Sequence, residues 1–175
     1  MSLTIERVDT GNLPPRILDE VRALCDEAYG VDLAQYFGDI GPGIHPLGWS
    51  GSTLVSHLMW VERVLHPEGG NPLRSAYVEL VATRISEQGR GFATELMKRL
   101  AHEIGSYDAG ALSPADTSLY QRLGWQRWPG PLFVRTARGV EATPDEEVMV
   151  LCPPGSAALD LAAPLSVDWP PVEVW

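Results

Sequence analysis

The chain has 175 residues and a mass of 19.1 kDa, with 45% apolar and 21% charged residues. These values favour a single folded domain over residues 1–175 and exclude wholesale disorder. The formal net charge of −10 argues against nonspecific binding to nucleic acid or to an anionic membrane, because both need basic patches. No apolar run approaches the roughly 20 residues of a membrane-spanning helix. We see no secretory signal and therefore expect a cytoplasmic protein.

Metal and disulfide chemistry have little support in the sequence. Two cysteines, Cys25 and Cys152, are too few and too far apart for a disulfide framework or a zinc cluster. Of the four histidines, His45 and His102 have no partner at metal-ligand spacing, and no H-E-x-x-H motif occurs. We place His57 in a strand and His66 in a turn, and we predict no metal.

The negative charge is concentrated at the end of the chain. Residues 139–175 contain seven acids and no lysine, arginine or histidine. Such a segment is either a solvated, solubilising tail or a wall that attracts a polycation. Composition alone leaves both interpretations open.

The first half of the chain reads as strands and two helices. Alternation predicts a strand over 3–8, and the Pro14-Pro15 pair begins a helix that stops at Gly30. A short helix or loop over 32–37 follows. We then expect a hairpin of strands over 45–49 and 53–65, and a further strand over 74–83.

The second half continues with shorter elements. A turn over 86–91 leads into an amphipathic helix that begins at Phe92 and ends at Gly105, and a small strand covers 109–112. Ser113, Pro114 and Asp116 read as a capping box that starts a short helix ending at Gly124. Further strands are expected over 125–128, 132–136 and 148–152. The order predicts a mixed α/β (α+β) sheet with one central parallel crossover.

The turn before the long helix is the strongest local signal. Two glycines and an alanine leave the start of the helix with almost no side chains. The backbone N–H groups there lack helical partners and lie at the positive end of the helix dipole. This arrangement favours a pyrophosphate. The alternative is a glycine-rich turn without a ligand. A Walker loop and a dinucleotide fingerprint are both excluded, because no GK pair occurs and Thr94 stands where the third glycine belongs.

A family resemblance joins these motifs. The strand YVELVAT, the Q-x-x-G-x-A turn, the amphipathic helix and the later L-Y-x-x-x-G-W together resemble a GNAT (GCN5-related) N-acetyltransferase. The resemblance implies a GNAT fold, a mixed central β-sheet with helices on both faces, and acetyl-CoA (or CoA) as co-substrate. It implies that the pantetheine arm pairs with the backbone of Val81, Ala82 and Thr83 like an added strand. Amides of the turn would take the pyrophosphate: Gln88, Gly89, Arg90, Gly91, Phe92 and Ala93.

Two residues are candidates for the proton transfers of acetylation. Glu79 is an acid in the middle of an apolar strand, and it can accept the proton of the amine directly or through water. The alternative is an acid on an exposed face at a sheet edge. Tyr120 is a phenol that is protonated at pH 7 and can donate to the leaving sulfur. The alternative is a core tyrosine with a satisfied hydroxyl.

The end of the chain is similar to the aminoglycoside 2'-N-acetyltransferases, through GALSPADTSLYQRLGWQRWPGP, TPDEE and the terminal VDWPPVEVW. In that family the chain end folds back to the acceptor pocket, and residues 139–175 would do so here. The resemblance also implies a homodimer. The residues that would line the polyamine site are Asp32, Glu79, Leu80, Ser113, Asp145, Glu146, Glu173 and Trp175.

The chain departs from that family in two places. Glu173 stands where a shorter aspartate is usual. The segment 35–43 lacks the expected acid and tryptophan, and Asp39 is a possible substitute. Two other functions stay open: a GNAT that acetylates another amine (a polyamine, an amine metabolite or a peptide N-terminus), and a non-catalytic acyl-CoA-binding module.

Overall fold

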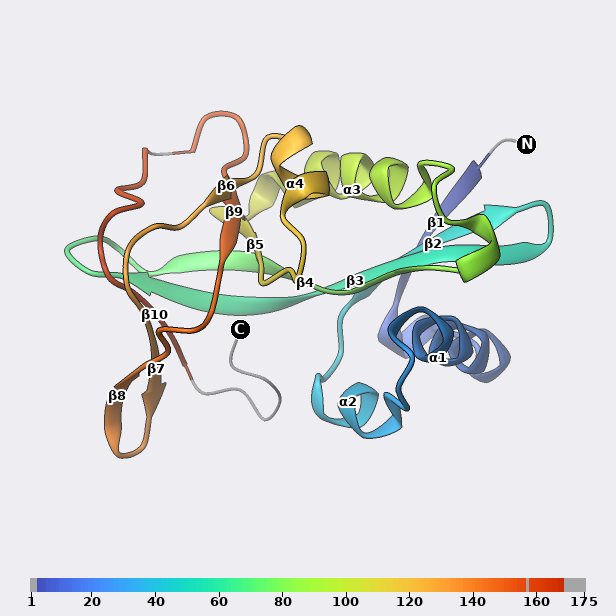
Figure 1. The fold of residues 1–175 in the computed structure, drawn as a ribbon, viewed down its shortest axis with the longest axis horizontal. Helices are drawn as coiled ribbons and strands as arrows, with labels where there is room; N and C mark the ends of the chain where they lie inside the picture. Colours follow the sequence, from blue (N-terminus) through green and yellow to red (C-terminus); the bar gives the residue numbers. More distant parts are fainter. Residues whose placement is uncertain (1–2, 157, 169–175) are drawn as a thin grey trace. The chain divides into compact units, whose positions relative to one another are not determined.

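The structure is a computed structural model that describes residues 3–156 and 158–168 (Figure 1). The chain forms two compact units, one of residues 1–61 with 78–100 and one of residues 62–77 with 101–175. Two long strands, β3 (Thr53–Pro67) and β4 (Leu73–Thr83), each contribute one end to each unit.

The first unit is built on an antiparallel meander. β1 (Leu3–Asp9) pairs with β2 (Ile44–Ser50), and β2 pairs with β3. Three helices belong to it: α1 (Pro15–Tyr29), α2 (Ala34–Asp39) and most of α3 (Phe92–Glu103). Short 3-10 turns cover Thr10–Asn12 and Ile85–Glu87. Figure 1 shows α3 on one face of these strands and α1 with α2 on the other, as predicted.

α1 shows why the sequence-based boundaries hold. Pro14 is the N-cap and Pro15 the first helical residue, a position where the missing N–H costs nothing. Gly30 ends the helix at a φ of +70°, and its N–H donates to the Asp26 carbonyl at 2.8 Å. The apolar stripe that includes Val21 and Leu24 is fully buried.

The second unit holds the remaining strands. They are β5 (Ala109–Leu112), β6 (Gln126–Arg127), β7 (Leu132–Thr136), β8 (Gly139–Ala142), β9 (Met149–Leu151) and β10 (Leu165–Asp168). Their order, with the ends of β3 and β4, is β6-β9-β5-β4-β3-β10-β7-β8. β4 and β5 are parallel, with Ser75 opposite Ala109, which confirms the predicted crossover. A 3-10 turn covers Ile104–Ser106, and α4 covers Ser118–Arg122.

Three expectations for this unit were wrong. The capping box does not form, because α4 begins at Ser118, and Asp116 accepts from the Ser118 N–H at 2.8 Å instead. His66 lies in β3 rather than in a turn. β8 and β10 were missed, since β8 is short and wholly exposed while β10 is defined by its parallel partner β7, about 30 residues away.

Two buried histidines join the elements of the first unit. His45 of β2 is 2% exposed and His57 of β3 is 0% exposed. His45 Nδ1 lies 3.0 Å from His57 Nε2. Burial lowers the pKa of His45 to about 4, and burial together with the neighbouring His45 lowers the pKa of His57 to about 3. Both imidazoles are therefore neutral at pH 7.

These two pKa values predict acid sensitivity. In the unfolded chain each imidazole binds a proton below about pH 6.5. In the folded chain His45 binds one only near pH 4 and His57 only near pH 3. The free energy of unfolding is therefore highest above pH 6.5 and falls as the pH drops, by up to about 1.4 kcal/mol per pH unit for each imidazole. Urea unfolding at pH 7.5 and 5.5 measures this loss. The His57→Asn variant should lose less stability over that interval, and an equal loss would contradict the prediction.

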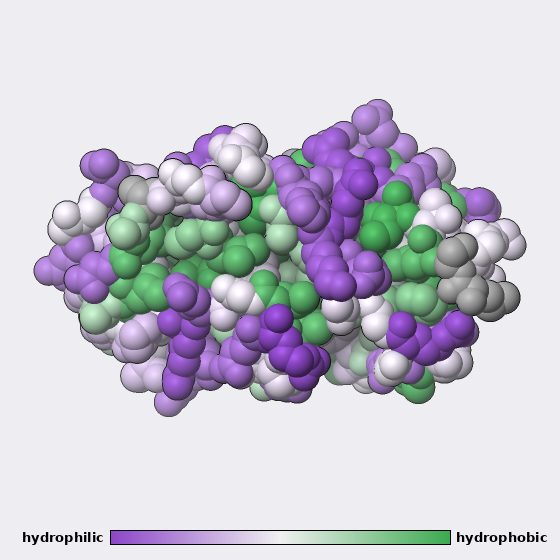
Figure 2. Space-filling model, turned by 90° about the horizontal axis from the view of Figure 1, so that it is seen from above, coloured by the Kyte–Doolittle hydropathy of each residue, from purple (hydrophilic) through white to green (hydrophobic). Residues whose placement is uncertain are grey.

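Few large apolar side chains are exposed among the residues that the structure describes. The large apolar residues that are exposed in the described part of the chain come from separate elements: Tyr29, Val31, Val64, Ile85 and Val140. On the face in Figure 2, apolar areas are broken up by polar side chains. Within residues 3–156 and 158–168, no helix has the length and apolar character needed to cross a membrane.

Candidate functional site

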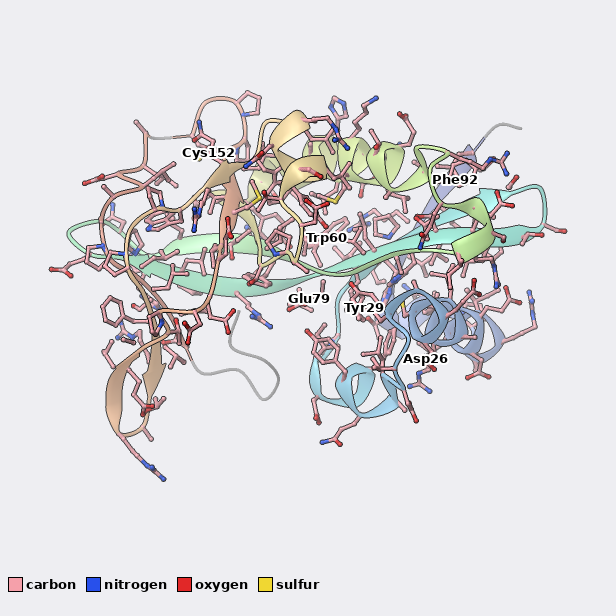
Figure 3. The ribbon with its side chains drawn as sticks, in the orientation of Figure 1. Asp26, Tyr29, Trp60, Glu79, Phe92 and Cys152 are labelled. Atoms are coloured by element: carbon pink, nitrogen blue, oxygen red, sulfur yellow. The ribbon has the colours of Figure 1, made fainter. Side chains whose placement is uncertain are left out.

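Glu79 lies in β4 with a half-buried side chain (Figure 3). Its Oε2 accepts a hydrogen bond from the Tyr36 hydroxyl of α2 at 2.8 Å. A carboxylate within an apolar strand that accepts from a tyrosine is held in a defined orientation. Tyr36 was missed by the sequence analysis, because its partner is 43 positions away.

The backbone changes direction at the next residue. Leu80 has a φ of +53°, the one positive φ among the described residues other than glycine. Such a conformation is strained for a residue with a side chain, and we infer from it a bulge in the strand. The recorded pairing of β4 with β5 covers Ser75–Tyr77 and ends before this point. Beyond the bulge, β4 is therefore suited to accept an extended ligand along its edge.

Side chains hold the carbonyls that follow the bulge. The Tyr29 hydroxyl donates to the Val81 carbonyl at 3.4 Å, and the Ser56 hydroxyl donates to the Ala82 carbonyl at 2.9 Å. The exposure of the side chains alternates from Glu79 to Thr83, as in a strand with one buried face. This end of β4 is thus a fixed edge, with Tyr29 at the end of α1 beside it (Figure 3).

The glycine turn has the open geometry that its sequence predicts. Gly89 and Gly91 have φ values of +76° and +83°, and a Cβ atom added to either would meet no heavy atom within 4 Å. Gly91 immediately precedes α3, whose first N–H groups lack helical partners. Phe92 turns inward and is buried, which anchors the helix start. Ala93 is half-buried in the first turn.

The polar side chains of this turn are engaged within the protein. The Gln88 side-chain amide donates to the Thr83 carbonyl at 3.2 Å. Arg90 forms an ion pair with Glu87 and lies over the Phe92 ring, 5.1 Å from its centroid. The turn therefore offers backbone N–H groups rather than free cationic side chains to an anion.

In the second unit, Tyr120 lies in α4 against Trp125. The two rings meet edge to face with centroids 6.2 Å apart. Burial, with a smaller contribution from the negative charge of Asp116, raises the pKa of Tyr120 to about 12. Its hydroxyl is therefore protonated at neutral pH and available as a donor.

The predicted acceptor residues are distributed over both units. Asp32 is exposed before α2, where its Oδ1 accepts from the Ala34 N–H at 2.8 Å, and Asp39 is exposed at the end of that helix. In the second unit, Ser113 is half-buried after β5, and Asp145 and Glu146 are exposed. Glu173 and Trp175 lie outside the described residues.

Some acids of the 139–175 segment already have partners in the second unit. Glu147 pairs with Arg127 at 3.0 Å, and Asp168 pairs with Arg135 at 3.4 Å and with His66 at 3.2 Å. These carboxylates are partly neutralised. Only part of the segment's charge is thus left to attract a cation.

Sequence reasoning also missed Ser56 and His57 as functional residues; they are the two polar residues in the buried stretch 54–61 of β3. The available signal was their position within TLVSHLMWV, since a buried polar side chain needs a hydrogen-bond partner. What the sequence does not reveal is the partner. Ser56 contacts Ala82 and Thr83, and His57 contacts Leu80.

Comparison with known proteins connects these features to a family. The sequence profile described as "Acetyltransferase (GNAT) domain" matches residues 18–128. The chain is 34% identical over 181 aligned residues to an aminoglycoside 2'-N-acetyltransferase of Mycolicibacterium fortuitum, with coverage of 98% of this chain and 92% of that protein.

Two solved structures show the same fold at low sequence identity. The GNAT family N-acetyltransferase YhbS of Escherichia coli, solved in complex with CoA, has a TM-score of 0.63 and 15% identity over 94% of this chain and 89% of its own. A GCN5-related N-acetyltransferase of Kribbella flavida has a TM-score of 0.58 and 19% identity over 74% of this chain. The match spans only 34% of the Kribbella flavida chain. The predicted mixed-sheet fold is confirmed.

Proposed function

Because this chain belongs to the GNAT family of N-acetyltransferases, we propose that it transfers an acetyl group from acetyl-CoA to an amine of a polycationic small molecule. The first candidate acceptor is the 2'-amine of an aminoglycoside. The observation that carries the proposal is the combination, in one unit, of a bulged β4 edge at Leu80, an open glycine turn before α3 and the half-buried Glu79.

The residues of the first unit fit acetyl-CoA. The space above Gly89 and Gly91 lets a pyrophosphate approach the backbone N–H groups at the start of α3, where the helix dipole is also favourable. The backbone of Val81, Ala82 and Thr83 would pair with the pantetheine arm at the edge that follows the bulge. Acetyl-CoA supplies a thioester carbonyl for direct transfer in a ternary complex.

Glu79 would serve as the base. An alkylamine is mostly protonated near pH 7 and becomes a nucleophile only after it loses a proton. The carboxylate can take this proton directly or through a water molecule, while the Tyr36 hydroxyl keeps it oriented. The same negative charge would also attract the ammonium form of the acceptor.

Tyr120 would donate a hydrogen bond to the departing thiolate. A phenol with a pKa of about 12 does not readily give its proton away, so it stabilises the thiolate mainly by hydrogen bonding. We expect Tyr120→Phe to lower kcat by about 10-fold to 100-fold with little change in acceptor KM, because only the transition state gains the hydrogen bond. Steady-state kinetics measure this. A raised KM with an unchanged kcat would assign Tyr120 to binding instead.

The case for an aminoglycoside rests on the Mycolicibacterium fortuitum relative and on charge. Asp32, Asp145 and Glu146 are exposed acids, and with Leu80, Ser113, Glu173 and Trp175 they would line the acceptor site. A carboxylate and an ammonium group about 4 Å apart attract with roughly 4 kcal/mol at an effective dielectric near 20, before desolvation and screening. A homodimer and a cytoplasmic location remain predictions, as does the absence of a metal.

The deciding experiment is a thiol-release assay with aminoglycosides that have or lack a 2'-amine, followed by NMR of the product. We expect turnover only with the 2'-amine and an acetyl group at that nitrogen. Turnover with other amines alone would identify a GNAT for a different cation. Stabilisation by CoA without thiol release from any amine would identify an acyl-CoA-binding module.

A further inference from the structure

A chain of buried side chains in the first unit ends on the peptide that forms the bulge. The Thr10 hydroxyl lies 2.9 Å from His45 Nε2, His45 Nδ1 lies 3.0 Å from His57 Nε2, and His57 Nδ1 lies 3.1 Å from the Leu80 carbonyl oxygen. These contacts connect the 3-10 turn after β1 to β4 through two imidazoles that are 2% and 0% exposed.

The Leu80 carbonyl at the end of this hydrogen-bonded chain determines which ring nitrogen of each histidine carries the hydrogen. A carbonyl oxygen can only accept, so Nδ1 of His57 must carry the hydrogen; otherwise two lone pairs would face each other at 3.1 Å. Since this imidazole is neutral, its Nε2 accepts from His45 Nδ1–H. His45 Nε2 in turn accepts from the Thr10 hydroxyl, whose oxygen accepts from the Gly43 N–H at 2.8 Å. The Gly43 carbonyl lies 3.0 Å from the same hydroxyl oxygen, but it already accepts from the Thr10 N–H at 2.9 Å, which leaves the hydroxyl hydrogen for His45.

The nearby thiol does not change this assignment. Cys25 Sγ lies 3.6 Å from His57 Nδ1 and is fully buried. Burial, with a smaller contribution from Asp26, raises the pKa of Cys25 to about 12, so the thiol stays neutral and is not paired with an imidazolium. The pair is a packing contact and not a nucleophilic dyad.

We propose that Thr10, His45 and His57 form a one-way chain of hydrogen bonds that fixes the Leu80–Val81 peptide in the bulge. His57 is thereby a positioning residue for the thioester of acetyl-CoA, a role that rests on the function proposed above. The reason lies in the planar trans peptide: when the Leu80 carbonyl points at His57, the N–H of Val81 must point the opposite way. That N–H belongs to the edge proposed to receive the ligand.

The chain also explains why the bulge persists. A leucine adopts a φ of +53° only where its surroundings impose it. Neighbouring β3 supplies the imidazole that holds the carbonyl, and β2 supplies the second imidazole that holds the first. Both imidazoles are therefore locked in one tautomer by the contacts of the fold.

The first test is nitrogen-15 NMR of the imidazoles in the full chain without ligand. We expect both His45 and His57 to be neutral, with the hydrogen on Nδ1, at pH 7. A hydrogen on Nε2 of His57 would overturn the proposal. This measurement needs no acceptor, so it stands even when the wild-type chain acetylates no amine and the proposed function fails by itself.

The second test compares two replacements of His57. His57→Phe keeps an aromatic ring, although a somewhat larger one, and removes the donor. In His57→Asn the amide nitrogen is separated from Cα by as many bonds as Nδ1 is in histidine. We expect His57→Phe to lower kcat by about tenfold or more and to weaken CoA binding by a smaller factor, because CoA keeps its pantetheine contacts with Ala82 and Thr83 and has no acetyl group to position. His57→Asn should recover most of kcat. Equal rates for wild type and His57→Phe, or no recovery in His57→Asn, would overturn the proposal.

The third test uses variants of Thr10 and can be carried out even if the variants of His57 do not fold. Thr10 is half-buried in the 3-10 turn after β1. Thr10→Val keeps the side-chain shape and removes the hydroxyl, both as the first donor of the chain and as the acceptor of the Gly43 N–H. Thr10→Ser keeps the hydroxyl. We expect Thr10→Val to shift the imidazole nitrogen signals and the Val81 amide signal, and Thr10→Ser to leave them near wild type. Identical spectra for the two variants would contradict a connected chain.

Discussion

We expect Glu79→Gln to lower kcat by about 100-fold or more, the usual cost of losing a general base. The change keeps the size of the side chain and a carbonyl oxygen for the Tyr36 hydroxyl, so the local structure should survive. What is lost is the group that takes the proton from the amine. The measurement is the thiol-release rate at saturating acetyl-CoA and acceptor.

The pH profile of this variant separates a base from a binding residue. At high pH the amine loses its proton without help, so the rate of Glu79→Gln should approach that of the wild type as the pH rises. Tyr36→Phe is the matched control, because it removes the orienting hydrogen bond but leaves the carboxylate; its kcat should fall by less than about tenfold. A Glu79→Gln variant with wild-type kcat at pH 7 would refute the base assignment.

The second large effect is expected at the turn. Gly91→Val should weaken CoA binding by about 100-fold, because the new side chain fills the space that the pyrophosphate needs and also strains a backbone with a φ of +83°. Within the protein itself, no atom obstructs the valine near its Cβ. The loss of affinity therefore reports on the ligand. Isothermal titration with CoA measures it.

Gly30→Val is a matched control for strain. Gly30 ends α1 with a φ of +70° and has equally open surroundings, but it lies outside the turn. Both variants should lose a similar amount of stability, about 1–2 kcal/mol from the left-handed backbone. Only Gly91→Val should lose CoA affinity. Equal affinities for CoA in the two variants would reject the turn as the pyrophosphate site.

Helices and turns could be predicted from the sequence where the residues that begin and end them lie within one short stretch of the chain. Pro14, Gly30 and the apolar stripe of α1 define one helix within a single window of residues. The glycine turn and the strand before it are likewise contiguous, and they carried the family resemblance. The capping-box prediction was wrong because the Asp116 carboxylate can accept from more than one nearby backbone N–H. In the structure it accepts from the N–H of Ser118, two residues later, instead of capping a helix that starts at Pro114.

Most helices and strands, the glycine turn, the acetyltransferase family and the candidacy of Glu79 as a base could be predicted from the sequence. The positive φ at Leu80, the Tyr36–Glu79 hydrogen bond and the line of imidazoles from Thr10 to β4 became visible only in the folded chain. Each of these joins residues that are between 12 and 43 positions apart along the chain. Propensity acts over a few neighbouring residues, whereas a buried hydrogen bond is settled only when packing brings its donor and acceptor together.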